Sequence, residues 1–159
     1  MHKHTLCSLT KSGAGFTMLE LLLALGIISF LMASIIVVFR PNVWFAGARN
    51  NKRTSDTHAL LNAIATRRAD NKGIFSCVSG EFPSARTRMS SGMGGYNIVP
   101  CLYPAYLPGV PRDPNGVGVY YTSTSSYDLG YEVWQDSVTG RVTVGAPFAE
   151  LGEVISAVR

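Results

Sequence analysis

The chain has 159 residues, of which 47% are hydrophobic and only 15% are charged, and its formal net charge is +4. This length predicts one small domain, and so few charges among so many apolar residues exclude a solvated, disordered chain. No segment combines a dense run of Lys and Arg with interleaved aromatic residues, so the sequence shows no clear nucleic-acid site.

An apolar run near the amino terminus is the strongest feature of the sequence. Residues 21–39 contain no charged residue, proline or amide, and residues 16–39 contain a single charge, Glu20. At about 1.5 Å per residue, a helix over 16–39 would reach roughly 36 Å, enough to cross a hydrocarbon core of about 30 Å. We therefore expect one membrane-spanning helix, which leaves about 120 residues for a modest domain with a single core.

An ordinary secretory signal peptide is one interpretation of this amino terminus. Positive charge precedes the apolar run, and Ala46-Gly47-Ala48 has the pattern of a cleavage site. The run is, however, much longer than the roughly 7 to 15 residues of a signal core, and Glu20 stands where a signal carries positive charge. Under this alternative the protein is a monomeric membrane-anchored or secreted binding domain.

The residues at the start of the run match a more specific pattern. Residues 11–20 read Lys-Ser-Gly-Ala-Gly-Phe-Thr-Met-Leu-Glu. The apolar run follows directly after Glu20. This junction strongly resembles that of the prepilin family, which comprises the type IV pilins, the minor pilins and the pseudopilins of type II secretion. The resemblance covers the leader, the cleavage junction and the first helix.

The resemblance implies specific roles for three residues. Residues 1–15 would be a leader, and a membrane-embedded prepilin peptidase would cut between Gly15 and Phe16 and methylate the new amino group of Phe16. Glu20 would neutralise the amino terminus of a neighbouring subunit. A carboxylate near the hydrocarbon region costs on the order of 2.5 to 3.5 kcal/mol on insertion scales. Together with the flanking Gly-Phe-Thr pattern, this cost favours a functional role for Glu20, whereas without the pattern a place among lipid headgroups would be preferred.

The resemblance also implies a location and partners. The chain would be a structural subunit of a type IV pilus or a type II secretion pseudopilus, held in the inner (cytoplasmic) membrane by one helix, with its globular domain outside the cytoplasm, and later part of an extracytoplasmic filament. Its partners would be other pilin or pseudopilin subunits, the prepilin peptidase, and an inner-membrane assembly platform with its ATPase. A count of nearby cations predicts the opposite orientation, with the carboxyl side of the helix in the cytoplasm. Four cations follow the run (Arg40, Arg49, Lys52, Arg53), whereas two precede it (Lys3, Lys11).

A second helix is expected after the apolar run. Pro41 predicts a kink or a break at its start. Within 56–72, apolar residues (Leu60, Leu61, Ile64, Ala65) recur at helical spacing, and Gly73 is a plausible carboxyl cap. The resemblance implies that residues 40–72 continue the spanning helix and pack on a small sheet, while periodicity alone fits a separate helix equally well.

Residues 73–116 contain seven glycines and six prolines, which predicts a long loop at the start of a globular region spanning 73–159. Cys77 and Cys101 are a candidate tether for this loop. With Cys7 in the leader, these two form an even number in an oxidising compartment, so we favour a disulfide over two reduced cysteines. Neither has a histidine or acid nearby that would suggest a nucleophile, and we expect no catalytic residues and no enzymatic activity.

The carboxyl-terminal third predicts an antiparallel sheet over 117–145. Its strand candidates are 117–122, 127–135 and 141–144, and in the second one Leu129, Tyr131 and Val133 share a face. The tail at 147–158 fits an edge strand or a short helix. The predicted fold class is therefore α+β, with a long amino-terminal helix packed on a small antiparallel sheet, as in pilins.

Two further residue types raise functional hypotheses. Six tyrosines of the carboxyl half fit either a binding surface or, as we favour, the ordinary covering of a sheet (Tyr103, Tyr106, Tyr120, Tyr121, Tyr127, Tyr131). The acids Asp113, Asp128 and Asp136 lack the ordered spacing of a calcium loop, so we expect neither a metal site nor a cofactor.

Overall fold

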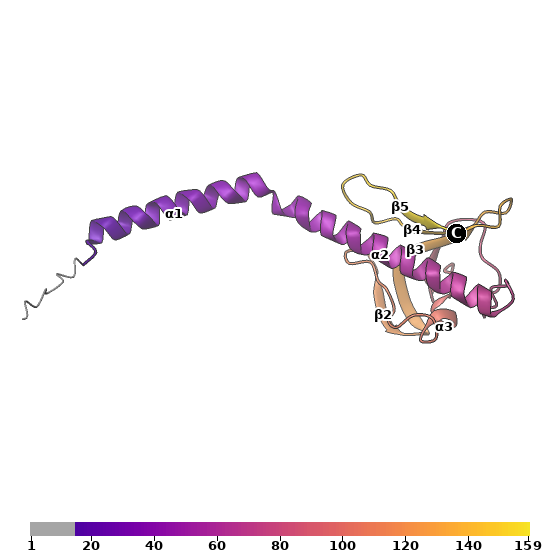
Figure 1. Ribbon diagram of the computed structural model, residues 1–159. Coiled ribbons are helices and arrows are strands. Elements are labelled where there is room, and N and C mark those ends of the chain that lie inside the picture. Colours follow the sequence, from indigo (N-terminus) through magenta and orange to yellow (C-terminus); the bar gives the residue numbers. More distant parts are fainter. Residues whose placement is uncertain (1–14) are drawn as a thin grey trace, which may run out of the picture. The chain divides into compact units, whose positions relative to one another are not determined.

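The computed structural model describes residues 15–159, so all of the predicted leader except Gly15 lies outside the described residues. The chain divides into two compact units, one ending at Pro41 and the other running from Asn42 to Arg159. The class is α+β, with an apolar amino-terminal helix followed by a small antiparallel sheet (Figure 1).

Helix α1 (Met18–Phe39) forms the first unit. Thr17 caps it, because its side-chain oxygen accepts a hydrogen bond of 3.2 Å from the backbone N–H of Glu20. Ser29 and Ser34 donate their hydroxyls to the carbonyls four residues earlier, which satisfies these polar groups inside an apolar helix. The helix ends at Arg40, whose φ of 40° lies in the left-handed region, so the predicted break is present.

Helix α2 (Pro41–Asp70) begins earlier than the helix predicted over 56–72. Pro41 is suited to a first position, where its missing N–H has no helical partner to lose. The buried face continues backwards from the apolar residues through polar ones, at the same spacing of three or four (Ala46, Asn50, Arg53, Thr57, Leu60, Ile64). Because half of this face is polar, apolar periodicity alone finds only the second half of the helix. At the other end Gly73, with a φ of 88°, donates to the carbonyl of Arg68, as expected of a carboxyl cap.

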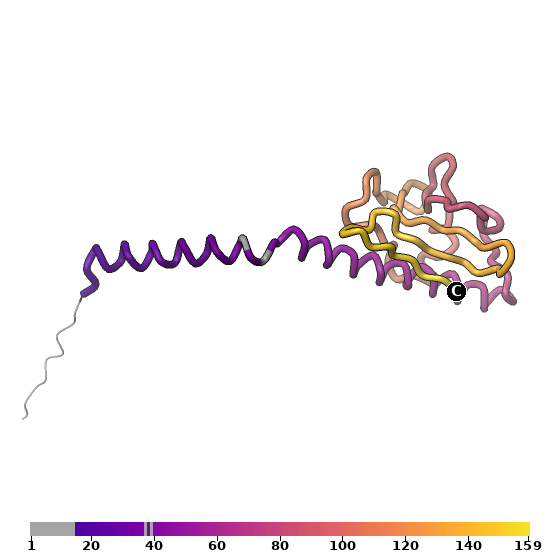
Figure 2. Tube along the Cα trace, turned by 90° about the horizontal axis from the view of Figure 1, so that it is seen from above, coloured from indigo at the N-terminus to yellow at the C-terminus, as the bar shows by residue number. Residues whose placement is uncertain are grey.

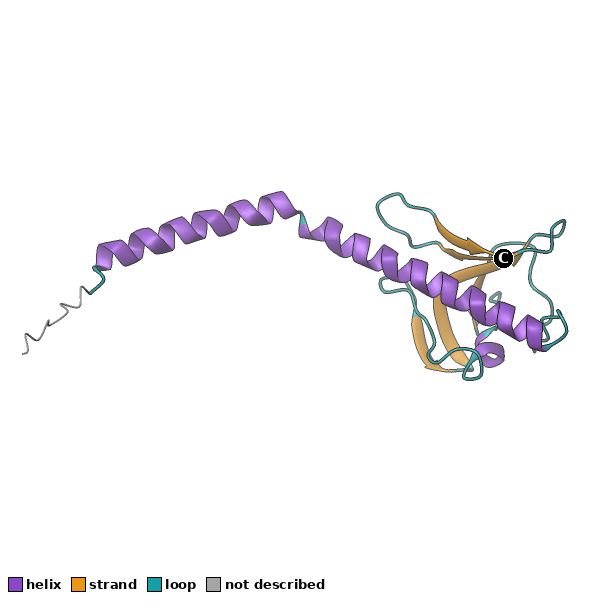
Figure 3. Ribbon diagram, in the orientation of Figure 1, coloured by secondary structure: helices purple, strands orange, loops and turns teal. Residues whose placement is uncertain are grey.

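Five antiparallel strands form one sheet, which lies against α2 (Figures 1 and 3). They are β1 (Thr87–Ser90), β2 (Tyr120–Ser123), β3 (Ser126–Gln135), β4 (Val142–Ala146) and β5 (Ile155–Val158). The order is β1-β3-β4-β5, and β2 pairs with the beginning of β3. The sheet therefore reaches beyond residue 145, and the tail forms an edge strand rather than a helix.

The long strand β3 has β1 along one edge and three partners along the other. On that second edge β2 pairs with its first residues and β4 with its last. Between them the backbone N–H of Asp113 donates to the carbonyl of Leu129, 2.9 Å away. Gly130, at a φ of 79°, makes this junction possible, since a Cβ there would lie 2.6 Å from a methyl of Val119 and 2.8 Å from the Cβ of Asp113.

The prediction of one long loop over 73–116 is wrong in two places. The segment contains β1, which pairs with β3, and the short helix α3 (Val99–Leu102). Both elements have four residues, and β1 has one long apolar side chain, Met89, so neither is long enough to show a period. Both are held by tertiary contacts, and Met89 and Leu102 are fully buried.

The core lies between α2 and the inner face of the sheet. Leu60 and Ile64 of α2 meet the alternating residues of β3, of which Leu129, Tyr131 and Val133 are fully buried, as the period of two predicts. Tyr127 and Tyr131 belong to this core, which supports the structural interpretation of these two tyrosines. Tyr120, on β2, is exposed.

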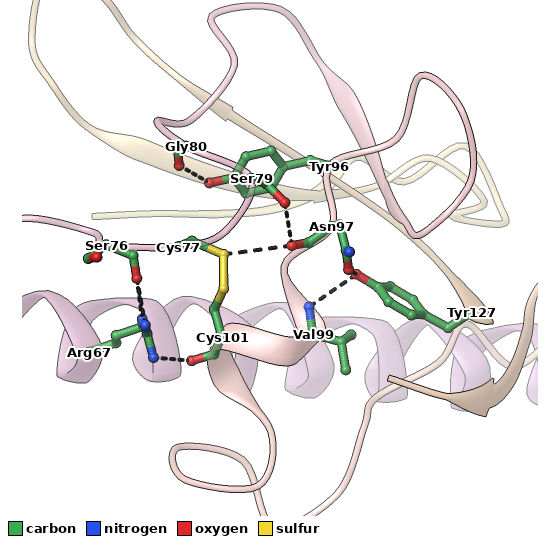
Figure 4. The surroundings of a disulfide bond; sticks show 10 residues. All are labelled: Arg67, Ser76, Cys77, Ser79, Gly80, Tyr96, Asn97, Val99, Cys101 and Tyr127. Atoms are coloured by element: carbon green, nitrogen blue, oxygen red, sulfur yellow. Dashed lines mark hydrogen bonds between the residues drawn. A yellow bond between two sulfur atoms is a disulfide. The ribbon is translucent and has the colours of Figure 1, made fainter. Parts of the chain in front are cut away.

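The predicted disulfide joins Cys77 and Cys101 (Figure 4). Arg67 of α2 fixes both sides of it, donating to the carbonyl of Ser76 at 2.9 Å and to that of Cys101 at 2.6 Å. The bridge therefore ties the segment after α2 to α3 and, through Arg67, to α2 itself.

Candidate assembly site

Gly15 and Phe16 lie in the segment that precedes α1. Neither is helical, both are exposed, and 77% of Phe16 is accessible. Among the described residues, no atom outside the two chain neighbours lies within 4 Å of the point where a Cβ of Gly15 would be. The described part of the chain therefore leaves the backbone between these two residues exposed.

Glu20 lies in the first turn of α1. Its carboxylate is exposed, and among residues 15–159 it takes part in no ion pair. The amino-terminal end of a helix favours a negative charge, and Thr17 caps the backbone N–H of the same residue. Glu20 is the one acid of α1, and its neighbours along the chain, Leu19 and Leu21, are apolar and exposed.

The rest of α1 is apolar around its whole circumference rather than along one stripe. The segment Met18–Ile36 is long and apolar enough to span a membrane, and none of it is buried within the chain. A helix that is hydrophobic on every side needs an apolar environment, which is either lipid or other helices. Glu20 is thus a single carboxylate at the start of an apolar surface that is exposed among residues 15–159.

The residues predicted from sequence fall into two separate places. Gly15, Phe16 and Glu20 are together because they are close in the chain. Cys77 and Cys101 belong to the second unit, where they stabilise the globular fold.

A buried ionic cluster beside α2 was not predicted. Arg53 of α2 is fully buried and donates to both carboxylate oxygens of Asp113, at 2.7 and 3.0 Å. Its remaining terminal nitrogen donates at 2.9 Å to Glu150 and, at the same distance, to Asn50. Arg49 forms a second two-pronged pair with Glu150, at 2.6 and 2.7 Å.

This ionic cluster, formed by Arg49, Asn50, Arg53, Asp113 and Glu150, shifts the pKa of Glu150 and of the two arginines. Hydrogen bonds from Arg49 and then Arg53 lower the pKa of Glu150 to about 2. The bond to Asp113 raises the pKa of Arg53 further above its already high value, against the opposing effect of burial. Both groups are thus held in their charged forms.

The same cluster fixes the loop between β4 and β5 on the first half of α2 (Figure 2). The side chain of Asn50 donates to the backbone carbonyl of Glu150 at 2.8 Å and accepts from its backbone N–H at 3.0 Å. The next residue, Leu151, has a φ of 61°, a conformation that is uncommon for a leucine.

A second polar contact joins α2 to the sheet. The hydroxyl of Tyr131 donates to Asp56 at 2.8 Å, and Lys52 also binds this carboxylate. Burial and the neighbouring Asp56 raise the pKa of Tyr131, so its hydroxyl stays protonated as a donor. The polar residues at positions 50, 53 and 57 repeat the helical spacing of Leu60 and Ile64, which is the sequence pattern that could have revealed this face.

The acids considered for a metal have other partners. Asp113 binds Arg53, and Asp128 binds Arg88 at 2.7 Å. Asp136 accepts two backbone N–H groups in the hairpin between β3 and β4. Over the part of the chain that the structure describes, no three His, Cys, Asp or Glu side chains are grouped so that they could hold a metal ion.

Comparison with known proteins adds no relative to these observations. No family model, no curated protein and no solved structure matches this chain.

Proposed function

We propose that this protein is a filament subunit of the prepilin type, serving a type IV pilus or a type II secretion pseudopilus. One observation carries the proposal: a helix that is apolar on all sides and exposed among the described residues has a single carboxylate, Glu20, in its first turn, shortly after the exposed residues Gly15 and Phe16. Such a helix is suited first to lipid and then to a bundle of identical helices.

In this proposal Glu20 acts during assembly. A prepilin peptidase removes residues 1–15 and methylates the amino group of Phe16. As α1 passes from lipid into the filament core, Glu20 pairs with the amino terminus of a neighbouring subunit, because an unpaired carboxylate in an apolar bundle is costly. The inner-membrane platform and its ATPase supply the energy, and the sequence has no nucleotide-binding loop of its own.

The proposal places the globular unit outside the cytoplasm. The disulfide Cys77–Cys101 supports this location, because such bonds persist in oxidising compartments. Two of the four cations that follow the apolar run have a structural role. Arg49 binds Glu150 and Arg53 binds Asp113, and both pairs hold α2 against the rest of the globular unit.

The experiment is to determine the mature amino terminus by mass spectrometry, in native membranes with and without the prepilin peptidase. The expected result is a chain that begins at a methylated Phe16 when the peptidase is present and at Met1 when it is absent. A chain that begins after Ala48, or that keeps Met1 in both membranes, would contradict the proposal and favour the alternative, an exported or anchored binding domain.

A further inference from the structure

Three consecutive residues in the first turns of α2 expose apolar side chains. Val43 is 46% exposed, Trp44 70% and Phe45 63%. Neighbouring residues of an α-helix point about 100° apart, so these three side chains cover more than half of the circumference. A helix that packs on one protein surface shows a stripe at a spacing of three or four, as α2 does against the sheet. Val43, Trp44 and Phe45 instead expose apolar surface over about 200° of the helix.

The loop between β4 and β5 adds a fourth apolar side chain at the same level. Leu151 is 53% exposed and, with Val43, Trp44, Gly47, Ala48 and Asn51, lines an open groove of about 400 Å³. The ionic cluster determines the position of Leu151, because Asn50 binds both the backbone N–H and the backbone carbonyl of the preceding residue, Glu150. Leu151 is thereby held at a positive φ with its side chain beside α2.

We propose that Trp44, Phe45 and Leu151 form an apolar collar that lies in the headgroup region of the bilayer. This inference rests on the part of the proposed function in which α1 spans the membrane. Tryptophan favours the membrane interface because its large ring is apolar while its indole N–H needs a polar partner. The collar would seat the globular unit against the lipid surface before assembly.

Chain length and charge support lipid as the partner that contacts this collar. Trp44 follows Phe39, the last residue of α1, by five positions, which reach at most about 18 Å even when fully extended. It therefore stays near the membrane surface whenever α1 spans the bilayer. Residues 21–55 contain no Asp or Glu, so no acid of this segment opposes contact with lipid phosphates.

The test uses the two tryptophans of the chain, Trp44 and Trp134. The full chain with Trp134→Phe reports Trp44 alone and is placed in phosphatidylcholine vesicles whose acyl chains are brominated either near the carbonyl end or near the methyl end. We expect a loss of Trp44 fluorescence that is larger with bromine near the carbonyl end. The Trp44→Phe chain, which reports Trp134, gives the background.

A matched pair of variants tests the position of the loop. In a chain with both native tryptophans replaced by Phe, Leu151→Trp is expected to lose fluorescence to bromine near the carbonyl end, whereas Val138→Trp keeps it. Val138 is 93% exposed in the hairpin where β4 begins, and Leu151 follows the opposite end of β4. Both side chains are exposed, and the two probes lie at opposite ends of β4.

Extraction of the same vesicles with alkaline carbonate distinguishes a failure of the collar from a failure of the membrane-spanning role of α1. If the chain resists extraction but Trp44 is not quenched, the collar is wrong while membrane anchoring stands. If carbonate removes the chain, the membrane-spanning role of α1 fails and the proposed function fails with it. If Trp44 is unquenched and its emission shifts to shorter wavelength as protein density rises, the patch is a contact between copies, which also overturns the collar.

Discussion

Arg53 and Asp113 are 60 residues apart in the chain, yet they form a two-pronged ion pair with no more than 1% of either side chain exposed. A buried pair of this kind specifies geometry more than it adds stability, because removing two charges from water is costly. Here it fixes how α2 meets the segment that completes the second edge of β3.

Breaking this pair on one side should be strongly destabilising. Arg53→Met leaves the carboxylate of Asp113 buried without its cation, and we expect a loss of about 3 to 5 kcal/mol in the free energy of unfolding. The double variant Arg53→Met with Asp113→Leu should lose less than the sum of the two single changes. Urea unfolding of the full chain in detergent, followed by near-UV circular dichroism, measures both. Purely additive losses would contradict the coupling.

Glu150 should make the globular unit sensitive to acid. Its pKa falls from 4.5 to about 2 in the folded chain, so its contribution to stability is complete above about 4.5 and is lost as the pH falls towards 2. We expect the melting temperature to decline over this range, and less steeply in Glu150→Gln. The decline should not vanish, because hydrogen bonds from the backbone N–H groups of Thr139 and then Val138 also lower the pKa of Asp136. Equal slopes in both chains would show that Glu150 is not responsible.

Removal of the disulfide should loosen the segment that follows α2. On the loop-entropy model, a bridge over a separation of 24 residues contributes about 3 kcal/mol. Replacing Cys77 and Cys101 together with Ser should therefore lower the unfolding free energy by about that amount. Hydrogen exchange should rise most at α3 and at residues 74–79. A uniform rise across the sheet would instead mean that the whole unit has loosened.

Two glycines with similar backbone angles should respond differently to Ala. Gly130 and Gly118 have φ values of 79° and 73°, but a Cβ would meet Val119 and Asp113 only at Gly130. Gly118→Ala should cost about 1 kcal/mol for its conformation alone. Gly130→Ala should cost at least about 2 kcal/mol, because overpacking adds to the same conformational term. Thermal unfolding of the two variants compares them directly, and equal losses would argue against crowding at Gly130.

Two substitutions at the start of α1 should separate the effect of the negative charge of Glu20 from the effect of the helix cap. Glu20→Gln keeps the backbone N–H that binds Thr17 but removes the negative charge. Under the proposed function it should leave cleavage after Gly15 intact and abolish filament assembly, as seen by shearing and immunoblotting. Thr17→Ala removes the cap, at about 1 kcal/mol, and should preserve assembly. Normal filaments from Glu20→Gln would contradict the assembly role.

The elements that were predictable from sequence are those with a long apolar pattern. The alternation in β3 and the uninterrupted apolar run of α1 needed no tertiary information. By contrast, β1 and α3 have four residues each and exist because Met89 and Leu102 enter a core built by distant segments. Local sequence contains too little of the stabilising interaction to predict them.

For the candidate site, Gly15, Phe16 and Glu20 could be named from the sequence because their pattern is contiguous, and their roles stay a prediction. The ionic cluster was not, because its members come from α2, from the segment before β2 and from the loop before β5. A polar residue at a core position is visible in the sequence only as an interruption, and its partner can be named only when the chain is folded.

The contacts between Arg49 and Glu150 span 101 positions, and β5 is the last element of the chain. Helix α2 is synthesised before its partner Glu150, so its polar face is not fully satisfied until residue 150 has emerged. Contacts that join the two ends of a unit form slowly, because the whole intervening chain must first be ordered. The globular unit therefore completes its fold only after residue 150 has been synthesised, and without Glu150 the side chain of Arg49 loses its ion pair while Arg53 keeps Asp113.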